Sequence, residues 1–287
     1  MIVRLSGGLG NQMFQYAFGR AMCHKHGEKL YLDTSAYARD RKRDFELQKY
    51  AIVRREGAFL QSFWYNCIRF LEHRIGHGEK LAKYLHYFRE AEVFRLYDFS
   101  HVKGYFDGCW QNEQYLEGIA EELRQEFVYR EMQLSQEQED ILASIECESS
   151  VAIHVRRGDY LDAECQRIYS LPGKEYYREA IDYMIRNVEK PHFYVFSDDI
   201  EWCKENFLDF GIRMTFIDGA INRNQHEDFA MMKACKHFII ANSTFSWWAS
   251  YLAIAEGKKV VAPKCWFVND DLNARVKEAL LRHVVLI

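Results

Sequence analysis

The second half of the chain alternates short apolar runs with amphipathic stretches. Continuous β-prone apolar runs occupy residues 151–155, 192–196, 214–217, 238–241 and 259–262. Between them, apolar residues recur at helical spacing in residues 175–188, 200–207, 227–236 and 245–256. Apolar runs that lack polar alternation are typical of strands covered on both faces. This β-α repetition predicts a mainly parallel, doubly wound sheet.

The chain opens with the same pattern. Residues 2–6 form a short β-prone run, and the glycines of residues 7–10 interrupt it. Helical spacing follows over 11–26 and ends at Gly27, a residue type that commonly closes helices. A second β-prone run covers 29–32. This beginning predicts a second α/β domain, and the polar stretch before residue 150 is interpreted as a helix followed by an interdomain connection.

Composition narrows the class of protein. The 287 residues are 48% hydrophobic and 28% charged, which is typical of globular proteins and excludes collagen-like, coiled-coil and disordered chains. The net charge of −4 argues against a general nucleic-acid partner, since such proteins are usually basic. No secretory leader or membrane-spanning apolar run is found, and the eight cysteines form no C-x-x-C or zinc motif. We therefore expect a cytoplasmic protein with reduced thiols.

Residues 58–100 are rich in aromatic side chains that alternate with Arg, Lys and His. One interpretation is a set of amphipathic helices whose rings form core. The other is an aromatic and basic surface that holds a sugar acceptor or rests on a membrane face. The sequence leaves both open.

Polar residues directly follow four of the predicted strands, at the place where open α/β sheets bind ligands. The four segments are 7–12, 154–160, 197–199 and 242–246. Arg156 and Arg157 are adjacent, and guanidinium groups match phosphate oxygens in charge and geometry. Residues 242–246 open a helix, so their hydroxyls and backbone N–H groups suit an anion. Two such features on one sheet edge predict a diphosphate site.

Structural interpretations compete with this one. Arg156 and Arg157 could form ion pairs with Asp159 and Asp199. Asp198 and Asp199 are better explained as a cap of the helix at residue 200 than as a metal site. Ser243 or Thr244 could serve only as the N-cap of a helix, and His154 taken alone could be a core histidine. The occurrence of all four segments on one edge favours the ligand site.

A dinucleotide-binding fold is the main alternative. A strand, a glycine turn, a helix and then Asp33 follow the layout of that fold. However, Met13 stands where the G-x-G-x-x-G motif needs its third glycine, and Arg156 and Arg157 would have no role. An NAD-type oxidoreductase therefore remains as the alternative function, and nucleotide preference separates the two.

Three longer motifs carry a family resemblance. They read GGLGNQMFQ at 7–15, HVRRGDY at 154–160 and NSTFSWW at 242–248. Together with 197–203 and 228–230, and in the same order over nearly the whole chain, they resemble the galactoside α-1,2-fucosyltransferases of glycosyltransferase family 11. A short chain without a membrane anchor is similar to the bacterial members, which decorate lipopolysaccharide or capsule.

The resemblance implies a GT-B-like fold with two Rossmann-like domains whose mainly parallel sheets face across a cleft. Residues 1–145 would form the acceptor side and residues 146–287 would bind GDP-fucose. The implied reaction transfers L-fucose from GDP-β-L-fucose to the 2-OH of a terminal β-galactoside with inversion and without a metal ion. The acceptor glycan can be lipid-linked, so the enzyme would at most associate peripherally with the inner face of the cytoplasmic membrane.

The resemblance also implies roles for individual residues. The implied donor-site residues are His154, Arg156, Arg157, Asp228, Asn242, Ser243, Thr244 and Ser246, joined by Gly10 and Gln12 of the glycine turn. Arg156 matches the phosphate-binding arginine, and His154 is placed for ribose or phosphate. Asp228 resembles the carboxylate that accepts hydrogen bonds from guanine. Asn11, from the opposite domain, would reach the fucose and the acceptor.

The catalytic base is not decided by the sequence. Inverting transfer requires a group that removes the proton of the acceptor hydroxyl. Asp159 follows the arginines, and Glu164 lies on the loop after them. Both remain candidates, and Asp159 could instead orient Arg157. A further alternative is a sugar-binding protein without catalytic activity. Release of GDP from GDP-fucose in the presence of an acceptor would exclude this alternative.

Overall fold

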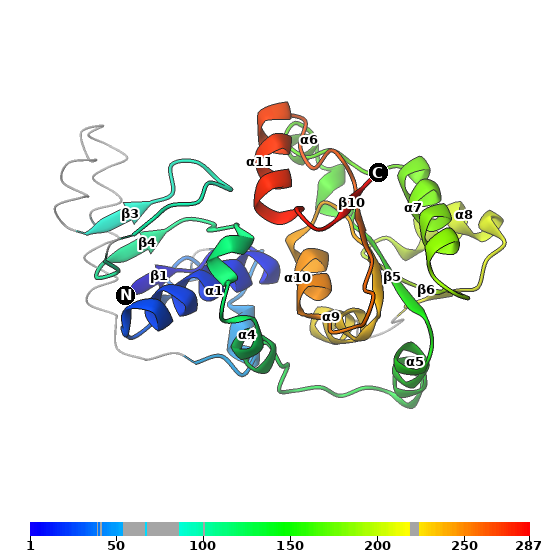
Figure 1. The fold of residues 1–287 in the computed structure, drawn as a ribbon, viewed down its shortest axis with the longest axis horizontal. Helices are drawn as coiled ribbons and strands as arrows, with labels where there is room; N and C mark the ends of the chain where they lie inside the picture. The colour runs from blue at the N-terminus through cyan, green and yellow to red at the C-terminus, as the bar shows by residue number, and fades with distance from the viewer. Residues whose placement is uncertain (39, 41, 54–66, 68–85, 100, 219–223) are drawn as a thin grey trace. The chain divides into compact units, whose positions relative to one another are not determined.

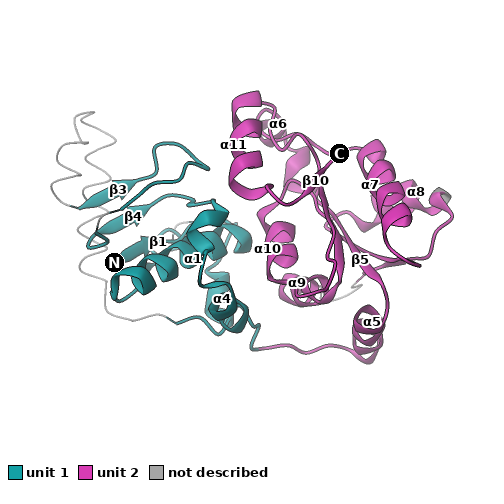
Figure 2. Cartoon of the chain, viewed as in Figure 1, with its two compact units in different colours: residues 1–130 teal, residues 131–287 magenta. Residues whose placement is uncertain are grey.

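The computed structural model describes the chain apart from residues 39, 41, 54–66, 68–85, 100 and 219–223 (Figure 1). Two compact α/β units, residues 1–130 and 131–287, make up the chain (Figure 2). In both units every pair of neighbouring strands within the described sheets runs parallel. The predicted fold class, α/β with two parallel sheets, is therefore confirmed. No helix among the described residues has the length and apolar character needed to cross a membrane.

Unit 1 has a four-stranded sheet in the order β2-β1-β4-β3. Its strands are β1 (Ile2–Arg4), β2 (Tyr31–Asp33), β3 (Tyr87–Arg89) and β4 (Tyr105–Asp107). Among its described residues, the helices are α1 (Leu9–His26), α4 (Ala120–Glu126) and the 3-10 turns η1 (Glu46–Lys49) and η2 (Glu113–Leu116). The predicted first strand, first helix and second strand are all present.

Helix α1 begins at the glycine turn and ends where the sequence indicates. Gly27 takes the left-handed conformation, with φ of 65°, and its N–H donates to the carbonyl of Cys23. Glycine adopts this conformation without a steric penalty, which explains the sharp end of the helix. The apolar face of α1 is buried, and the Phe18 ring stacks on Trp110 with centroids 4.4 Å apart. This packing fixes α1 against the segment that follows β4.

The aromatic stretch at 58–100 lies largely outside the described residues. In its described part, Phe88 stacks on Phe106 at 4.8 Å, and Phe99 packs edge-to-face on Phe106 and Trp110. The rings of residues 86–99 therefore contribute to the core, but this part contains strand β3 in place of the expected amphipathic helix. The expectation of a surface built from residues 58–85 stays a prediction.

Unit 2 has a six-stranded sheet in the order β10-β9-β8-β5-β6-β7. The strands are β5 (Ser150–Val155), β6 (His192–Ser197), β7 (Met214–Phe216), β8 (His237–Ile239), β9 (Val260–Ala262) and β10 (Val285–Leu286). The longer helices are α5 (Gln136–Cys147), α7 (Lys174–Asn187), α8 (Ile200–Phe207), α9 (Gln225–Ala234), α10 (Thr244–Leu252) and α11 (Asp270–Leu280). Short helical turns are η3 (Asp159–Leu161), α6 (Ala163–Gln166) and η4 (Leu208–Phe210). All nine strands and helices predicted between residues 151 and 262 are observed.

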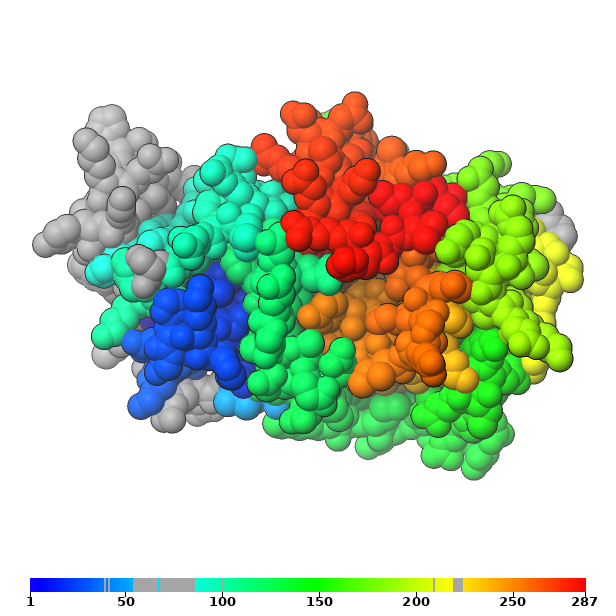
Figure 3. All heavy atoms as spheres, in the orientation of Figure 1, coloured from blue at the N-terminus to red at the C-terminus, as the bar shows by residue number. Residues whose placement is uncertain are grey.

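Alternate residues of the central strands face opposite helical layers. Val151, Ile153 and Val155 of β5 pack with the buried faces of α7 and α8. The intervening His154 contacts Phe245 of α10, so α7 and α8 lie on one face of the sheet and α9 and α10 on the other (Figure 1). In Figure 3 the last residues of the chain, coloured red, lie at the surface of unit 2 beside the orange segment that includes β9. Burial on both faces explains why these strands lack polar alternation.

The predicted domain boundary between residues 145 and 146 is displaced. It falls inside α5, whereas the compact units divide after Arg130. Ser135 and Gln138 form a capping box that starts α5, and this helix packs on β5 and α9 of unit 2. Ile145 is the one buried residue of α5. The sequence of this helix is therefore almost as polar as that of a linker, which explains why the boundary was expected inside it.

Candidate active site

In the sheet of unit 2, the order in which the chain adds its parallel strands reverses between β5 and β8. From β5 it proceeds outward to β6 and β7, and then returns to β8, β9 and β10 on the other side. In open parallel sheets the loops at such a reversal diverge and leave a crevice beyond the carboxyl ends of the strands. Residues 156–160 follow β5 and residues 240–243 follow β8, so both predicted anion-binding segments belong to this position.

Arg156 lies at this edge between two carboxylates. Its Nη2 is 2.6 Å from Oδ1 of Asp159, and its Nη1 is 2.8 Å from Oδ2 of Asp198. The guanidinium also lies 5.9 Å from the ring centre of Tyr160 and keeps 31% of its side-chain surface exposed. Each terminal nitrogen carries two hydrogens, so a guanidinium held in this way can still donate to an incoming anion. Arg156 is thus oriented and accessible.

Arg157 has a different environment. Its guanidinium stacks 4.2 Å above the Trp202 ring, and its Nε donates to Oδ2 of Asp199 over 3.0 Å. Its side chain is 16% exposed, about half as much as that of Arg156. Asp199 also caps α8, because its Oδ1 accepts the N–H of Trp202. Arg157 therefore connects the loop after β5 to the start of α8.

Asp198 organises the loop after β5 from the neighbouring strand. Its Oδ1 accepts the backbone N–H of Arg157 over 2.8 Å, while its Oδ2 binds Arg156. A Cβ atom on Gly158 would lie 2.7 Å from the same Oδ2, which is too close. One carboxylate thus contacts two consecutive residues of the loop and requires glycine at the third.

The loop after β8 is fixed by Asn242. Its Nδ2 donates to the carbonyls of Ser170 and Trp266 over 2.6 and 2.9 Å, and the residue is 2% exposed. The hydroxyl of Tyr160 donates to the carbonyl of Asn242 over 3.0 Å, and burial raises the pKa of that hydroxyl, which keeps it a donor. Ser243 is the N-cap of α10, and its Oγ accepts the N–H of Phe245. The edge therefore presents Arg156 beside the positive end of α10.

Comparison with known proteins decides the family. The model of glycosyl transferase family 11 matches residues 79–283, more than half of the chain. An α-1,2-colitosyltransferase of Escherichia coli is 35% identical over 283 residues, covering 96% of this chain and 94% of that protein. The chain belongs to glycosyltransferase family 11. Human galactoside α-(1,2)-fucosyltransferase 1 is 34% identical over 47% of the chain and 39% of its own length.

The fold of this family 11 glycosyltransferase also resembles solved structures. The fucosyltransferase NodZ from Bradyrhizobium aligns with a TM-score of 0.51, covering 88% of this chain and 92% of NodZ, at 14% identity. A second relative in sequence is the O-antigen biosynthesis glycosyltransferase WbnK of Escherichia coli, 29% identical over 93% of this chain and 95% of its own length. The sequence resemblance to family 11 and the GT-B-like fold are both confirmed.

Two further predicted donor-site residues of the family 11 enzyme lie on the α9–α10 side of the sheet. His154 is 7% exposed, and its ring packs against Phe245 at 5.6 Å. Phe245 in turn packs on Phe229 of α9 at 5.3 Å. Asp228, in the first turn of α9, is 8% exposed. The aromatic contacts place His154 in a packed layer, and its role at ribose or phosphate stays a prediction.

The two candidate bases differ in environment. Asp159 starts η3 and is paired with Arg156, not with Arg157 as the sequence suggested. Glu164 is exposed in the first turn of the four-residue helix α6. The choice between the two candidates stays open.

In unit 1 the residues of the glycine turn serve different purposes. The Gln12 amide donates to the carbonyls of Gly7 and Asp44 and accepts the N–H of Leu47, so its hydrogen-bonding atoms bind within the unit. Gly10 is buried in the first turn of α1. Asn11 is half-buried, and its Oδ1 accepts a hydrogen bond from Nε2 of Gln111, which follows β4.

Asp33 does not resemble a ribose-binding residue. It is 3% exposed, its Oδ1 accepts the N–H of Ser35, and its Oδ2 accepts the hydroxyl of Tyr105. Both oxygens are thus engaged inside unit 1. With family 11 membership, this placement removes the argument for an NAD-type oxidoreductase.

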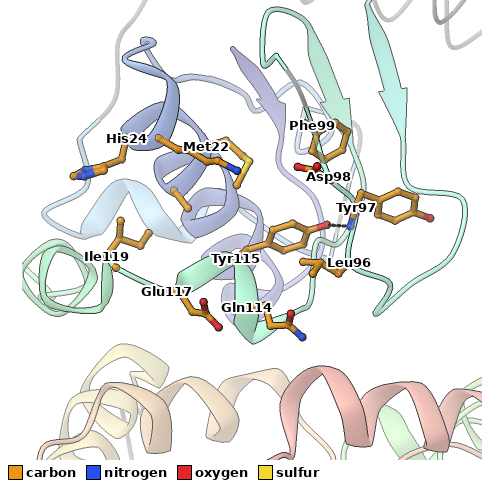
Figure 4. A pocket seen from close by; sticks show the side chains of 13 residues that line it. Met22, His24, Leu96, Tyr97, Asp98, Phe99, Gln114, Tyr115, Glu117 and Ile119 are labelled. Carbon is orange, nitrogen blue, oxygen red and sulfur yellow. Dashed lines mark hydrogen bonds between the residues drawn. The ribbon is translucent and has the colours of Figure 1, made fainter.

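A pocket of about 520 Å³ opens on unit 1 between the last turns of α1 and η2 (Figure 4). Met22, Leu96, Tyr97 and Tyr115 are among its walls, and the hydroxyl of Tyr115 accepts the N–H of Tyr97. None of the predicted site residues lines it. The pocket therefore shares no lining residue with the candidate donor site.

Sequence reasoning missed three contributors to the candidate donor site. Asp198 appears in a predicted segment but was interpreted only as a helix cap, whereas it binds Arg156 directly. Trp202 supports Arg157, and Tyr160 joins the loops after β5 and β8. The signal for Asp198 was that β5 and β6 are consecutive strands joined by a helix, and consecutive strands of this kind are often neighbours in the sheet.

Proposed function

We propose that the enzyme transfers L-fucose from GDP-β-L-fucose to the 2-OH of a terminal β-galactoside, with inversion, during synthesis of a surface polysaccharide. The observation that carries this proposal is the oriented Arg156 guanidinium at the reversal between β5 and β8, beside the N-terminus of α10. A fixed guanidinium and a helix N-terminus are suited to a departing diphosphate. The α-1,2 linkage is taken from the names of the colitosyltransferase and the human relative, and fucose and the galactoside acceptor are taken from the name of the human relative. The name of WbnK, an O-antigen biosynthesis glycosyltransferase, favours a surface polysaccharide.

In the proposed reaction the 2-oxygen of galactose attacks C1 of fucose from the face opposite the diphosphate. The C1–O bond to the β-phosphate breaks as the new glycosidic bond forms, and GDP leaves with the electron pair. Arg156 stabilises the negative charge that develops on the diphosphate. A carboxylate, Asp159 or Glu164, takes the proton of the attacking hydroxyl.

Colitose is a second candidate for the transferred sugar, because the relative with 35% identity is a colitosyltransferase. Colitose is fucose that lacks the 3-hydroxyl, so the two donors differ in one oxygen atom. The proposal is tested by incubating the enzyme with GDP-fucose or GDP-colitose and with lactose or Galβ1,3-N-acetylhexosamine. We expect GDP-fucose to release GDP in an acceptor-dependent reaction. If GDP is released only from GDP-colitose, the transferred sugar is colitose. If GDP is released from neither donor, the proposal is contradicted.

Activity is expected to survive chelation of divalent metal ions. Arg156 and the N-terminus of α10 supply the positive charge that a metal would otherwise provide. Within the described part of the chain, no group of three or more His, Cys, Asp or Glu side chains is arranged to hold a metal ion. The initial rate with EDTA should stay within about twofold of the untreated rate. Loss of activity that Mn²⁺ or Mg²⁺ restores would argue against metal-independent transfer.

Asp228 is expected to select guanine. Its carboxylate can accept hydrogen bonds from N1–H and N2–H₂ of guanine, whereas adenine presents an unprotonated N1 and no amine at C2. A polar group that stays buried without a partner costs about 1–3 kcal/mol, which is the expected penalty for ADP. Asp228→Ala should therefore weaken GDP binding and remove the preference for GDP over ADP in isothermal titrations.

Glu227 offers a matched control for this measurement. It is also acidic, lies in the first turn of α9 and is 6% exposed. Glu227→Ala removes the same charge from the same helix end and should keep base selectivity. Equal effects of the two substitutions would identify Asp228 as a helix-end charge that favours the dipole.

A further inference from the structure

Asp198 lies beside Arg156 because of the register between two strands. Val155, the last residue of β5, pairs with Ser197, the last residue of β6. The residues that follow them, Arg156 and Asp198, therefore leave the sheet side by side at its carboxyl edge. Open parallel sheets bind ligands beyond this edge. The carboxylate is thus a neighbour of the guanidinium that the proposed function assigns to the diphosphate.

The carboxylate of Asp198 meets three consecutive positions of the loop after β5. Its Oδ2 is 2.8 Å from Nη1 of Arg156, and its Oδ1 accepts the backbone N–H of Arg157 over 2.8 Å. A Cβ on Gly158 would lie 2.7 Å from the same Oδ2, a distance that Cβ atoms essentially never show. The place that Oδ2 occupies therefore depends on the missing side chain at position 158.

The backbone that carries Asp198 is fixed on both sides. Before it, all six residues of β6 pair with β5. After it, Asp199 is the N-cap of α8, and its own N–H donates to Oγ of Ser197 over 2.9 Å. A short side chain on such a support has little freedom. The sheet and the start of α8 therefore set the position of the Asp198 carboxylate, and the loop after β5 adjusts to it.

A carboxylate at this place has an electrostatic cost. Arg156 lies between Asp198 and Asp159, so two negative charges flank its single positive charge. Arg157 adds no surplus charge, since its Nε is paired with Asp199. Like charges repel, and Asp198 therefore opposes the binding of a diphosphate in the ground state. Any benefit of Asp198 for the reaction has to come from its contact with the guanidinium.

We propose that Asp198 is a positioning residue that fixes the direction of the Arg156 guanidinium, and that Gly158 provides the space for its carboxylate. The inference rests on the proposed function. A guanidinium has five N–H groups in one plane, and the contacts with Asp159 and Asp198 orient that plane without using all five. Donors oriented in advance need no reorganisation when charge develops on the leaving diphosphate. Asp198 thus favours the transition state at the expense of ground-state binding.

Asp198→Asn separates the orientation of Arg156 from ground-state binding. Asparagine has one acceptor oxygen where aspartate has two, so it gives up either Arg156 or the N–H of Arg157, and it no longer repels the diphosphate. We expect kcat for fucosyl transfer to fall about 10- to 100-fold. The dissociation constant for GDP in isothermal titrations should stay unchanged or decrease by up to about fivefold. Asp182→Asn, at an exposed position of α7, is the matched control and should keep both values.

Gly158→Ala displaces the same carboxylate without removing its charge. The new methyl group would occupy the space next to Oδ2 of Asp198, and the end of a side chain moves more easily than the backbone. We expect kcat to fall about 10-fold in the wild-type background. In the Asp198→Ala background the methyl group meets no carboxylate, so the additional loss should stay below about twofold. Steady-state kinetics of the two single variants and the double variant measure this coupling.

Several results would overturn the proposal. Near-wild-type kcat of Asp198→Asn would show that the direction of Arg156 does not depend on this carboxylate. A loss of GDP affinity by the same factor as kcat would show that Asp198 only maintains the structure of the site. Equal costs of Gly158→Ala in both backgrounds would show that the glycine does not serve the carboxylate. Failure of the wild-type enzyme to transfer fucose would instead count against the proposed function, and the titrations with GDP do not depend on the transferred sugar.

Discussion

Replacing Arg156 by alanine is expected to lower kcat/KM for transfer about 100- to 1,000-fold while the protein stays folded. Arg156 is the more exposed of the two adjacent arginines and lies at the reversal between β5 and β8. Its loss removes the positive charge from the site and leaves the carboxylates of Asp159 and Asp198 to repel the diphosphate. Arg156→Lys should recover little, because one ammonium cannot bridge the two carboxylates and a phosphate as a guanidinium does.

Arg157 provides the comparison. Arg157→Ala removes the stack on Trp202 and the contact with Asp199, so we expect a lower melting temperature as well as weaker activity. Arg156→Ala should change the melting temperature less. Steady-state kinetics and thermal unfolding of both variants measure the contrast. Near-wild-type turnover of Arg156→Ala would remove this residue from the diphosphate site.

The second large effect concerns stability. Asn242→Ala is expected to lower the free energy of unfolding by about 2–4 kcal/mol, because the buried carbonyl of Trp266 and the partly buried carbonyl of Ser170 would each lose a donor. A Ser243→Ala variant removes only the N-cap of α10 and should cost about 1 kcal/mol. Urea unfolding of the two variants gives the comparison.

A small loss of stability in Asn242→Ala, together with weak GDP binding, would favour a direct contact between the Asn242 amide and the donor. The structure supports the other view, in which the amide nitrogen joins three loops and the residue serves the site by holding the start of α10 in place. Asn242 was predicted from the sequence as a donor-site residue, and its two carbonyl partners were not visible there.

The sequence predicted the elements of unit 2 well because its strands are buried on both faces. Val151–Val155 is a run of apolar residues broken only by His154, and such runs between amphipathic helices have few alternative folds. The three-residue strands β3 and β4 were not predicted. Their sequences, Tyr-Phe-Arg and Tyr-Phe-Asp, carry too little periodicity to distinguish a strand from an aromatic helix face.

The candidate site was predicted in part for a similar reason. The position of Arg156 at the end of a strand follows from local pattern, and its neighbour Asp159 is three residues away. The contacts of Asp198 with Arg156 and of Gln111 with Asn11 span 42 and 100 residues and depend on which strands are neighbours. Strand order is set by the packing of whole helical layers, and no single motif contains it.

The central claim is the transfer of fucose to the 2-position of galactose, and the linkage of the product tests it most directly. The enzyme is incubated with GDP-β-L-fucose and a β-galactoside, and the purified product is examined by NMR. We predict an α-configured fucosyl residue whose anomeric proton correlates with C2 of galactose. A β-configured product, attachment at another galactose carbon, or free fucose as the sole product would contradict the account.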